Sequence, residues 1–205
     1  MPRSPADRGT GVLAALQWDR GRWIWLLALV LFLDILSGLG DPVTLALRYD
    51  RAAIGAGGWW RLLTAHAVHL DLHHLILNEL GLVLLWALFA SDYDAVDWLI
   101  VVCAGALAIS AGLWWGSPRV GWYVGASGLL HTAMAAGIAA HLATRAWDRW
   151  ILLGCFLIKL AWEQYAEHSG RTPPLIVVDA HLYGALSGFI VGAALCWRMA
   201  IIRVR

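Results

Sequence analysis

The chain has 205 residues, of which 60% are hydrophobic and only 14% are charged, and its mean hydropathy is +0.67. A soluble globular domain carries about 25% charged residues, so this chain has too few charges to cover a surface that faces water. Its net charge of +1 gives no reason to expect a nucleic-acid partner. Cys103, Cys155 and Cys196 all lie in apolar stretches, so we expect each to be a small core residue rather than part of a disulfide framework.

Long apolar stretches follow one another along the chain. A membrane-spanning helix needs about 20 mostly apolar residues. Six stretches fit this description: 23–39, 72–90, 97–115, 125–142, 149–164 and 178–197. The first has no clear small-residue cleavage site, so we expect it to be retained rather than removed as a signal peptide. Tryptophans gather at the ends of the stretches, as in the aromatic belts of membrane interfaces. The sequence therefore predicts an all-α membrane protein with six transmembrane helices.

The predicted organisation is a short segment 1–22, a membrane domain 23–197 and a short basic tail 198–205. Arginines are distributed unequally between the two sides of such a bundle. Nine lie on the side of the termini (Arg3, Arg8, Arg20, Arg22, Arg145, Arg149, Arg198, Arg203 and Arg205) and five on the other (Arg48, Arg51, Arg61, Arg119 and Arg171). Because basic residues favour cytoplasmic loops, we expect both termini in the cytoplasm.

Polar residues occur near the starts of the even-numbered stretches, which all begin at the same face of the bundle. The second stretch begins LDLHHLILNEL and carries His74 and Asn78, the fourth begins GASGLLHT and carries Ser127, and the sixth follows VDAHLYGALSG with His181. Polar groups in lipid are costly and usually face a bundle interior or a water-filled cavity. We therefore expect these side chains to meet at one depth, just below the outer face.

A stripe of small residues indicates which helices touch. His181, Gly184, Gly188 and Gly192 recur at helical spacing on one face of the last stretch, and glycines on one face let a neighbouring helix approach closely. The natural neighbour is the fourth stretch, whose start is equally small, so we expect the His181 imidazole beside the Ser127 hydroxyl. An adjacent imidazole activates a serine for nucleophilic attack. The set supports acyl transfer without a carboxylate.

The stretches HLILN, GASG and AHLYGALSG, preceded by WWRLLTAHAVH, resemble the rhomboid family of intramembrane serine proteases over about residues 60–197. The resemblance implies a six-helix bundle in which Ser127 and His181 form a catalytic dyad and His74 and Asn78 line the oxyanion site. It also implies supporting roles for small or neighbouring residues of the motifs (Gly125, Gly128, His131 and Gly184), and no metal and no cofactor.

A narrower resemblance, to the rhombosortase branch, rests on LRYDRAAIGAGGWWRLLTAHAVHL, SGLLH and VDAHL. His131 stands where many rhomboids have tyrosine, and Thr132 departs from the glycine of the branch. This resemblance implies cleavage of membrane-anchored proteins that end in a Gly-Gly-containing motif, one apolar helix and a basic tail, by hydrolysis or by transfer to another amine. It further implies a bacterial inner membrane, with the active site near the periplasmic face.

Two side chains near the expected dyad leave alternatives open. His131 lies one helical turn after Ser127 and is a second candidate base, but a base must come within about 3 Å of the hydroxyl. We expect His131 instead to pack against or hydrogen-bond His181. Asp179 lies about 200° around the helix from His181, so we do not expect it to orient that ring, and a role in contacting substrate or holding a loop stays open.

Two rival classes remain. One is a non-catalytic rhomboid-like membrane chaperone. The other is a metal or haem protein, suggested by the density of His66, His69, His73 and His74, although no cysteine or carboxylate completes a four-ligand site there.

The pair Trp60–Arg61 resembles a family motif that steadies the first external loop, and a plain interfacial anchor is the alternative. The charges in or near the stretches are interpreted as helix-end or paired charges (Asp34, Glu79, Lys159 and Glu163).

Overall fold

The computed structural model describes residues 23–142, 147–172 and 176–204, so the predicted segment 1–22 lies outside the described residues. The described residues form α1 (Trp23–Gly38), α2 (Asp41–Leu47), β1 (Tyr49–Asp50), α3 (Arg51–Gly55), α4 (Arg61–Thr64), η3 (Ala65–Ala67), α5 (Leu72–Phe89), α6 (Ala95–Trp115), β2 (Trp122–Tyr123), α7 (Ser127–Leu142), α8 (Asp148–His168) and α9 (Val178–Val204).

Six helices coincide with the predicted apolar stretches: α1, α5, α6, α7, α8 and α9. By length and apolar composition, α5, α6 and α9 are able to cross a membrane, and α1 with α2 gives a fourth candidate that is bent by 110°. The chain is therefore a mostly helical protein with several candidate membrane spans. The last helix continues to Val204, past the predicted end of its stretch at residue 197.

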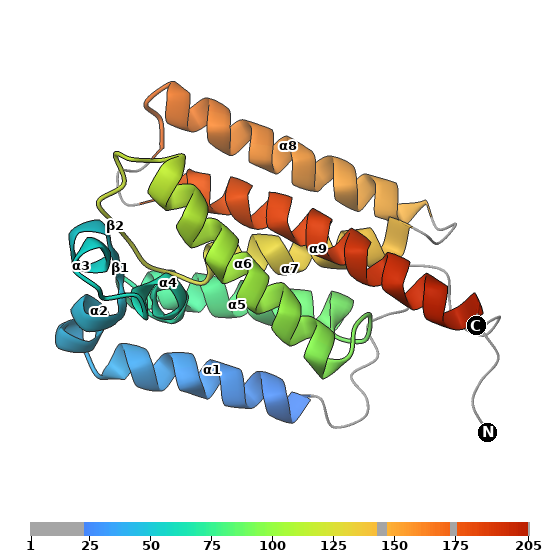
Figure 1. Ribbon diagram of the computed structural model, residues 1–205, viewed down its shortest axis with the longest axis horizontal. Coiled ribbons are helices and arrows are strands. Elements are labelled where there is room, and N and C mark those ends of the chain that lie inside the picture. Colours follow the sequence, from blue (N-terminus) through green and yellow to red (C-terminus); the bar gives the residue numbers. More distant parts are fainter. Residues whose placement is uncertain (1–22, 143–146, 173–175, 205) are drawn as a thin grey trace.

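The helices lie side by side, with α8 along one outer side and α1 along the opposite one (Figure 1). The short elements α2, α3, β1 and β2 gather at the end of the bundle away from the C-terminus (Figure 1). Large apolar side chains are widely exposed, for example Trp25 at 71%, Ile158 at 71% and Ile190 at 70%. Such a surface suits contact with lipid rather than water.

Cys103 and Cys155 are exposed on this surface, so their predicted core placement is wrong, and Cys196 is half-buried.

The closest packing in the bundle is between α7 and α9. A methyl group on Gly184 would overlap the carbonyl oxygen of Gly128, and one on Gly188 would overlap the carbonyl oxygen of Thr132. Farther along, a methyl group on Gly192 would lie 2.9 Å from the Cα atom of Ala136. The contact predicted from the glycine stripe is confirmed, because the backbones approach closely only where side chains are absent.

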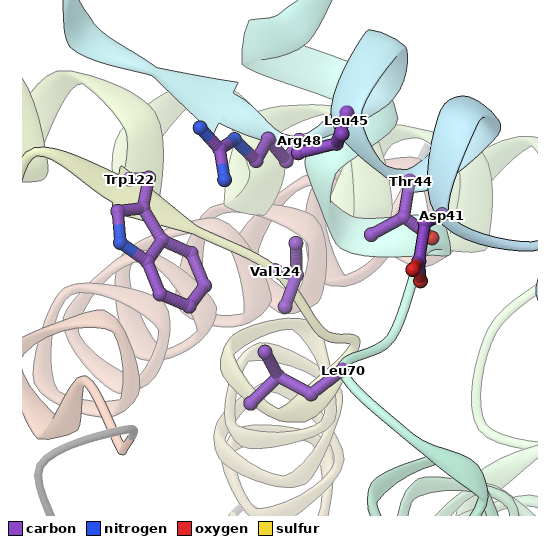
Figure 2. A pocket seen from close by; sticks show the side chains of 7 residues that line it. All are labelled: Asp41, Thr44, Leu45, Arg48, Leu70, Trp122 and Val124. Carbon is purple, nitrogen blue, oxygen red and sulfur yellow. The ribbon is translucent and has the colours of Figure 1, made fainter.

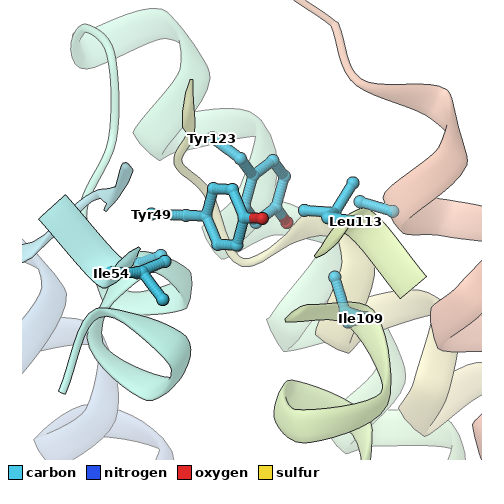
Figure 3. Close-up of a cluster of buried hydrophobic side chains, with 7 residues drawn as sticks. Tyr49, Ile54, Ile109, Leu113 and Tyr123 are labelled. Atoms are coloured by element: carbon cyan, nitrogen blue, oxygen red, sulfur yellow. The ribbon is translucent and has the colours of Figure 1, made fainter. Parts of the chain in front are cut away.

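The connection between α1 and α5 is fastened to the rest of the protein by main-chain and arginine contacts. Strand β1 pairs antiparallel with β2, with Tyr49 opposite Tyr123. Both tyrosines are buried in a cluster with Ile54, Ile109 and Leu113 (Figure 3). This cluster joins the connection to α6, and it carries the segment that leads into α7.

Two arginines hold the same connection through backbone carbonyls. Arg51 donates to four carbonyl oxygens at and after the C-terminal end of α6, those of Leu113, Trp114, Ser117 and Val120. Arg61 donates to the carbonyl oxygens of Leu45 at 2.8 Å and Arg48 at 2.9 Å. Arg61 therefore fastens two parts of the connection to each other, the start of α4 and the end of α2, as the family motif implies, rather than acting only as an interfacial anchor.

Aspartate caps explain where several helices begin. The Asp71 carboxylate accepts from the backbone N–H of His74 at 2.8 Å, and α5 starts directly after it. The Asp94 carboxylate likewise caps α6. A side-chain acceptor at this position satisfies a donor that the first turn leaves free. The cap on α5 fixes the register of its first turns, which carry His74 and Asn78.

Candidate active site

Ser127 and His181 meet at the close contact between α7 and α9. Ser127 is the first residue of α7, and His181 lies in the first turn of α9. The Oγ atom of Ser127 is 2.9 Å from Nε2 of His181, and the histidine is buried. This distance suits direct proton transfer from hydroxyl to imidazole. The hydroxyl and the imidazole that the sequence placed together are therefore in contact.

The turn before Ser127 requires glycine at position 125. Gly125 has φ of +115°, a conformation that residues with a side chain rarely adopt. Its N–H donates to the carbonyl oxygen of Ala65 at 3.0 Å, and its own carbonyl accepts from the Tyr123 hydroxyl at 2.7 Å. A methyl group here would lie 2.6 Å from Cε1 of His74. Gly125 therefore allows both the turn and the approach of the His74 ring to it.

Asn78 is buried and forms a hydrogen bond within its own helix. Asn78 is 4% exposed, and its Nδ2 atom donates to the His74 carbonyl oxygen at 2.9 Å, within α5. The Nδ1 atom of His74 is buried without a hydrogen-bond partner, and its ring meets His69 edge to face at a centroid distance of 5.2 Å. In the described residues no hydrogen bond joins Asn78 to Ser127, whereas the His74 ring lies against the turn that precedes Ser127.

His131 stacks on His181, as expected. The ring centroids are 4.1 Å apart and the planes differ by 8°. The Nδ1 atom of His131 lies 2.7 Å from the carbonyl oxygen of Ser127, and its Nε2 atom lies 2.7 Å from Nζ of Lys159. Both ring nitrogens of His131 thus have partners other than the Ser127 hydroxyl, which argues against the alternative that His131 is the base.

A carboxylate that the sequence did not assign to the site contacts His181 from α8. Oε2 of Glu163 is 3.1 Å from Nδ1 of His181, and Oε1 of Glu163 is 2.6 Å from Nζ of Lys159. The sequence analysis required no carboxylate for acyl transfer and gave Glu163 no role at the site, whereas the structure places its carboxylate against His181. One signal was present: Glu163 lies at the end of the fifth stretch, which is the face where the sixth stretch begins.

Asp179 is directed elsewhere. Its Oδ2 atom accepts from the Ser117 hydroxyl at 2.5 Å, and that hydroxyl is also 3.0 Å from the hydroxyl of Tyr183. Asp179 therefore joins the start of α9 to the segment after α6. This contact favours the loop-holding role over the orientation of His181.

The donor atoms of His131, Glu163 and His181 lie within 4.8 Å of one another, the one such group of three among the described residues. Lys159 argues against a cation there, because its ammonium lies 2.7 Å from Nε2 of His131. The histidines upstream of α5 do not form a group of this kind in the described part of the chain. His66, for example, contacts the carbonyl oxygen of Ala106 at 3.2 Å.

A pocket lies beside the Ser127 turn, between α2 and the strand β2 (Figure 2). It is lined by Asp41, Thr44, Leu45, Arg48, Leu70, Trp122 and Val124. Val124 directly precedes Gly125, so the pocket adjoins the backbone that leads to the candidate nucleophile. Its lining mixes apolar side chains with one acidic and one basic group.

Comparison with known proteins bears on the same segment. The model of one protein family, described as the Rhomboid domain, matches residues 56–198. The match covers well over half of the chain and includes every residue of the contacts around Ser127 and His181. A search of curated proteins found no match.

Proposed function

Because the chain belongs to the rhomboid family of intramembrane proteases, we propose that it is a serine endopeptidase that cuts membrane-anchored proteins. The family also has inactive members, so the proposal needs support from the site itself. That support is the contact of 2.9 Å between the Ser127 hydroxyl and the His181 imidazole, the arrangement that a serine nucleophile needs.

In the proposed reaction, Ser127 attacks the scissile carbonyl while Nε2 of His181 takes its proton. The tetrahedral oxyanion is stabilised by the backbone N–H of Ser127 and by His74, whose ring lies against Gly125. Asn78 joins them once its amide turns away from the His74 carbonyl that it contacts here. His181 then returns the proton to the leaving amine, and the acyl-enzyme passes its acyl group to water or to another amine.

We further propose that α1, α5, α6, α7, α8 and α9 each cross the membrane, with the site near the outer, periplasmic face of a bacterial inner membrane and both termini in the cytoplasm. The start of α7 and the start of α9 lie at the same end of the bundle, which supports a single shallow site. At the other end, Arg198 pairs with Asp97 at 2.5 Å, and a basic residue at that end supports its assignment to the cytoplasm.

The proposed substrates carry a C-terminal anchor with a Gly-Gly-type motif. The resemblance of the segments around Trp60 and Ser127 to the rhombosortase branch supports this choice. The chemistry is compatible with it, because a peptide bond must leave its helix to be attacked and glycine weakens a helix by about 1 kcal/mol relative to alanine.

Co-expression with a reporter that carries such an anchor tests the proposal. Wild-type protein is expected to release the reporter, and Ser127→Ala is expected to abolish release because no nucleophile remains. Ser187→Ala, which removes a buried hydroxyl of α9 outside the site, serves as the matched control. Mass spectrometry of the new C-terminus identifies the cut bond and any added amine.

Labelling with a fluorophosphonate checks the same hydroxyl without a substrate. Label on wild-type protein and Ser187→Ala, but not on Ser127→Ala, supports a catalytic serine. Wild-type protein that is folded yet neither labels nor cleaves would instead be a non-catalytic membrane chaperone.

A further inference from the structure

We propose that Glu163 is a positioning residue for His181, so that the site operates as a serine–histidine–glutamate triad rather than as a dyad. This inference rests on the proposed protease function. It begins from an unbroken chain of contacts through the imidazole, with Ser127 Oγ at 2.9 Å from Nε2 and Glu163 Oε2 at 3.1 Å from Nδ1. The three groups come from three helices, α7, α9 and α8.

The carboxylate selects the tautomer of His181 that catalysis needs. An ionised carboxylate only accepts hydrogen bonds, so the Nδ1 atom that faces Glu163 carries the hydrogen. Nε2 is then left with its lone pair directed at the Ser127 hydroxyl, ready to take a proton. Without the carboxylate, the tautomer with hydrogen on Nε2 becomes accessible, and that form cannot act as the base.

Lys159 fixes the orientation of the carboxylate. Its ammonium donates to Oε1 of Glu163 at 2.6 Å and to Nε2 of His131 at 2.7 Å. The pair Lys159–Glu163 lies one helical turn apart on α8, so the charges offset each other in the resting site. Oε2 therefore stays free to accept from His181, and it stabilises the imidazolium that forms when the Ser127 proton is transferred.

His131 completes the arrangement as a neutral ring. The Ser127 carbonyl only accepts, so Nδ1 of His131 carries the hydrogen that it donates at 2.7 Å, and Nε2 accepts from Lys159. A neutral His131 can stack on His181 at 4.1 Å without opposing the positive charge that develops there. The stack holds the plane of the His181 ring, and Glu163 holds its rotation.

In the proposed step, the Oγ–H bond of Ser127 breaks as Oγ bonds to the substrate carbonyl carbon, and the proton moves to Nε2 of His181. The Nδ1 hydrogen stays on the imidazolium, and Glu163 remains ionised throughout. The same proton then leaves Nε2 for the departing amine. Glu163 acts through His181, because its hydrogen bonds in the described part of the site are to His181 and Lys159, and Nε2 of His131 is farther from its Oε2, at 3.8 Å.

The decisive variant is Glu163→Gln, which keeps the size of the side chain but can donate to Nδ1 and so support the wrong tautomer. The corresponding carboxylate-to-amide change, Asp to Asn, in a serine protease triad lowers kcat by about 10⁴-fold. Here the Glu163 side chain is 20% exposed, so water can partly replace it, and we expect a fall in kcat of about 100-fold with KM within about twofold. Glu167→Gln, one turn later on α8 and exposed, is the matched control with wild-type kcat.

A spectroscopic readout separates positioning from a merely structural contact. In protein labelled with ¹⁵N-histidine, the His181 resonances, identified by their loss in His181→Gln, are expected to report hydrogen on Nδ1 in the wild type. In Glu163→Gln they are expected to shift toward hydrogen on Nε2, and in Glu167→Gln they should not change.

Several outcomes would overturn the inference while leaving the protease itself intact. If Ser127→Ala abolishes cleavage but Glu163→Gln stays within about threefold of wild-type kcat, the site is a dyad. The same conclusion follows if Glu163→Gln loses activity only in proportion to lost folded protein and keeps the Nδ1 hydrogen. Inhibition of the wild type by added Zn²⁺ that disappears in Glu163→Gln would assign the cluster to a metal instead. If Ser127→Ala is fully active, the proposed protease function fails first.

Discussion

Replacement of Gly184 by alanine is expected to reduce both stability and cleavage, because it separates the helices that carry the two proposed catalytic groups. The new methyl group would overlap the carbonyl oxygen of Gly128 and lie 3.0 Å from Oγ1 of Thr132. Since backbone atoms of α7 form most of this contact, α9 has to move by about 1 Å to restore ordinary van der Waals separation. Overpacking of this kind costs about 1–3 kcal/mol.

The catalytic effect follows from the position of His181 one turn before Gly184. A misplacement of about 1 Å can cost about 100-fold in rate, and Ser127 Oγ and His181 Nε2 begin at 2.9 Å. We therefore expect kcat to fall by about 100-fold, and Tm to fall by about 2–4 °C per kcal/mol lost. Reporter cleavage by purified protein and thermal unfolding in the same detergent measure the two effects.

Gly154→Ala is the matched control for this prediction. Gly154 lies on α8, and apart from the neighbouring atoms of that helix no described residue comes within 4 Å of the added methyl group. The change is therefore expected to leave kcat unaltered and to stabilise the helix by up to about 1 kcal/mol. Equal effects of the two substitutions, or a stable and fully active Gly184→Ala, would refute the idea that glycine contact sets the Ser127–His181 distance.

Two further predictions concern stability. Arg51→Met removes the donors to four carbonyl oxygens near the C-terminal end of α6, so it should lower the free energy of unfolding by about 2–4 kcal/mol. Arg119 is exposed, and Arg119→Met should have little effect on thermal unfolding. Similar melting of the two variants would argue against this role of Arg51. Burial lowers the pKa of His66 from 6.5 to about 4 in the folded protein. As the pH drops from 6.5 toward 4, the unfolded chain is therefore protonated at His66 while the folded protein is not, and the free energy of unfolding should fall. His66→Gln keeps a donor toward the Ala106 carbonyl without titrating, and its Tm should depend less on pH over this window; an unchanged slope would remove His66 as the cause.

Local sequence patterns predicted the helices and one contact between them. The apolar stretches follow from composition alone, because each is a run of roughly 16 or more mostly apolar residues, about the length that a membrane-spanning helix needs. The start of α5 at Leu72 matches its predicted start, since Asp71 can cap only the turn that follows it. The meeting of Ser127 with His181 was predictable because glycines at helical spacing mark one face of α9 and a small-residue start marks α7.

Other features depend on contacts that no local pattern encodes. The two-residue pairing of β1 with β2 joins segments far apart in the chain, and two residues are too few to carry a periodicity. Arg51 reads as an ordinary basic loop residue until the end of α6 is placed beside it. The bond of Asn78 to its own helix likewise reflects a side-chain rotation that spacing does not define.

The sequence by itself determined where the six long helices lie, which of their ends carry polar groups, and that α7 and α9 are able to touch, because composition and periodicity act within one helix at a time. It did not predict the short helices α2, α3, α4 and η3. Only the tertiary structure decided that Glu163 faces His181 and that Lys159 bridges Glu163 and His131. Those contacts depend on how α8 is rotated and how deep it sits against its neighbours. Rotation and depth are set by packing across the whole bundle, and local sequence patterns do not encode that packing.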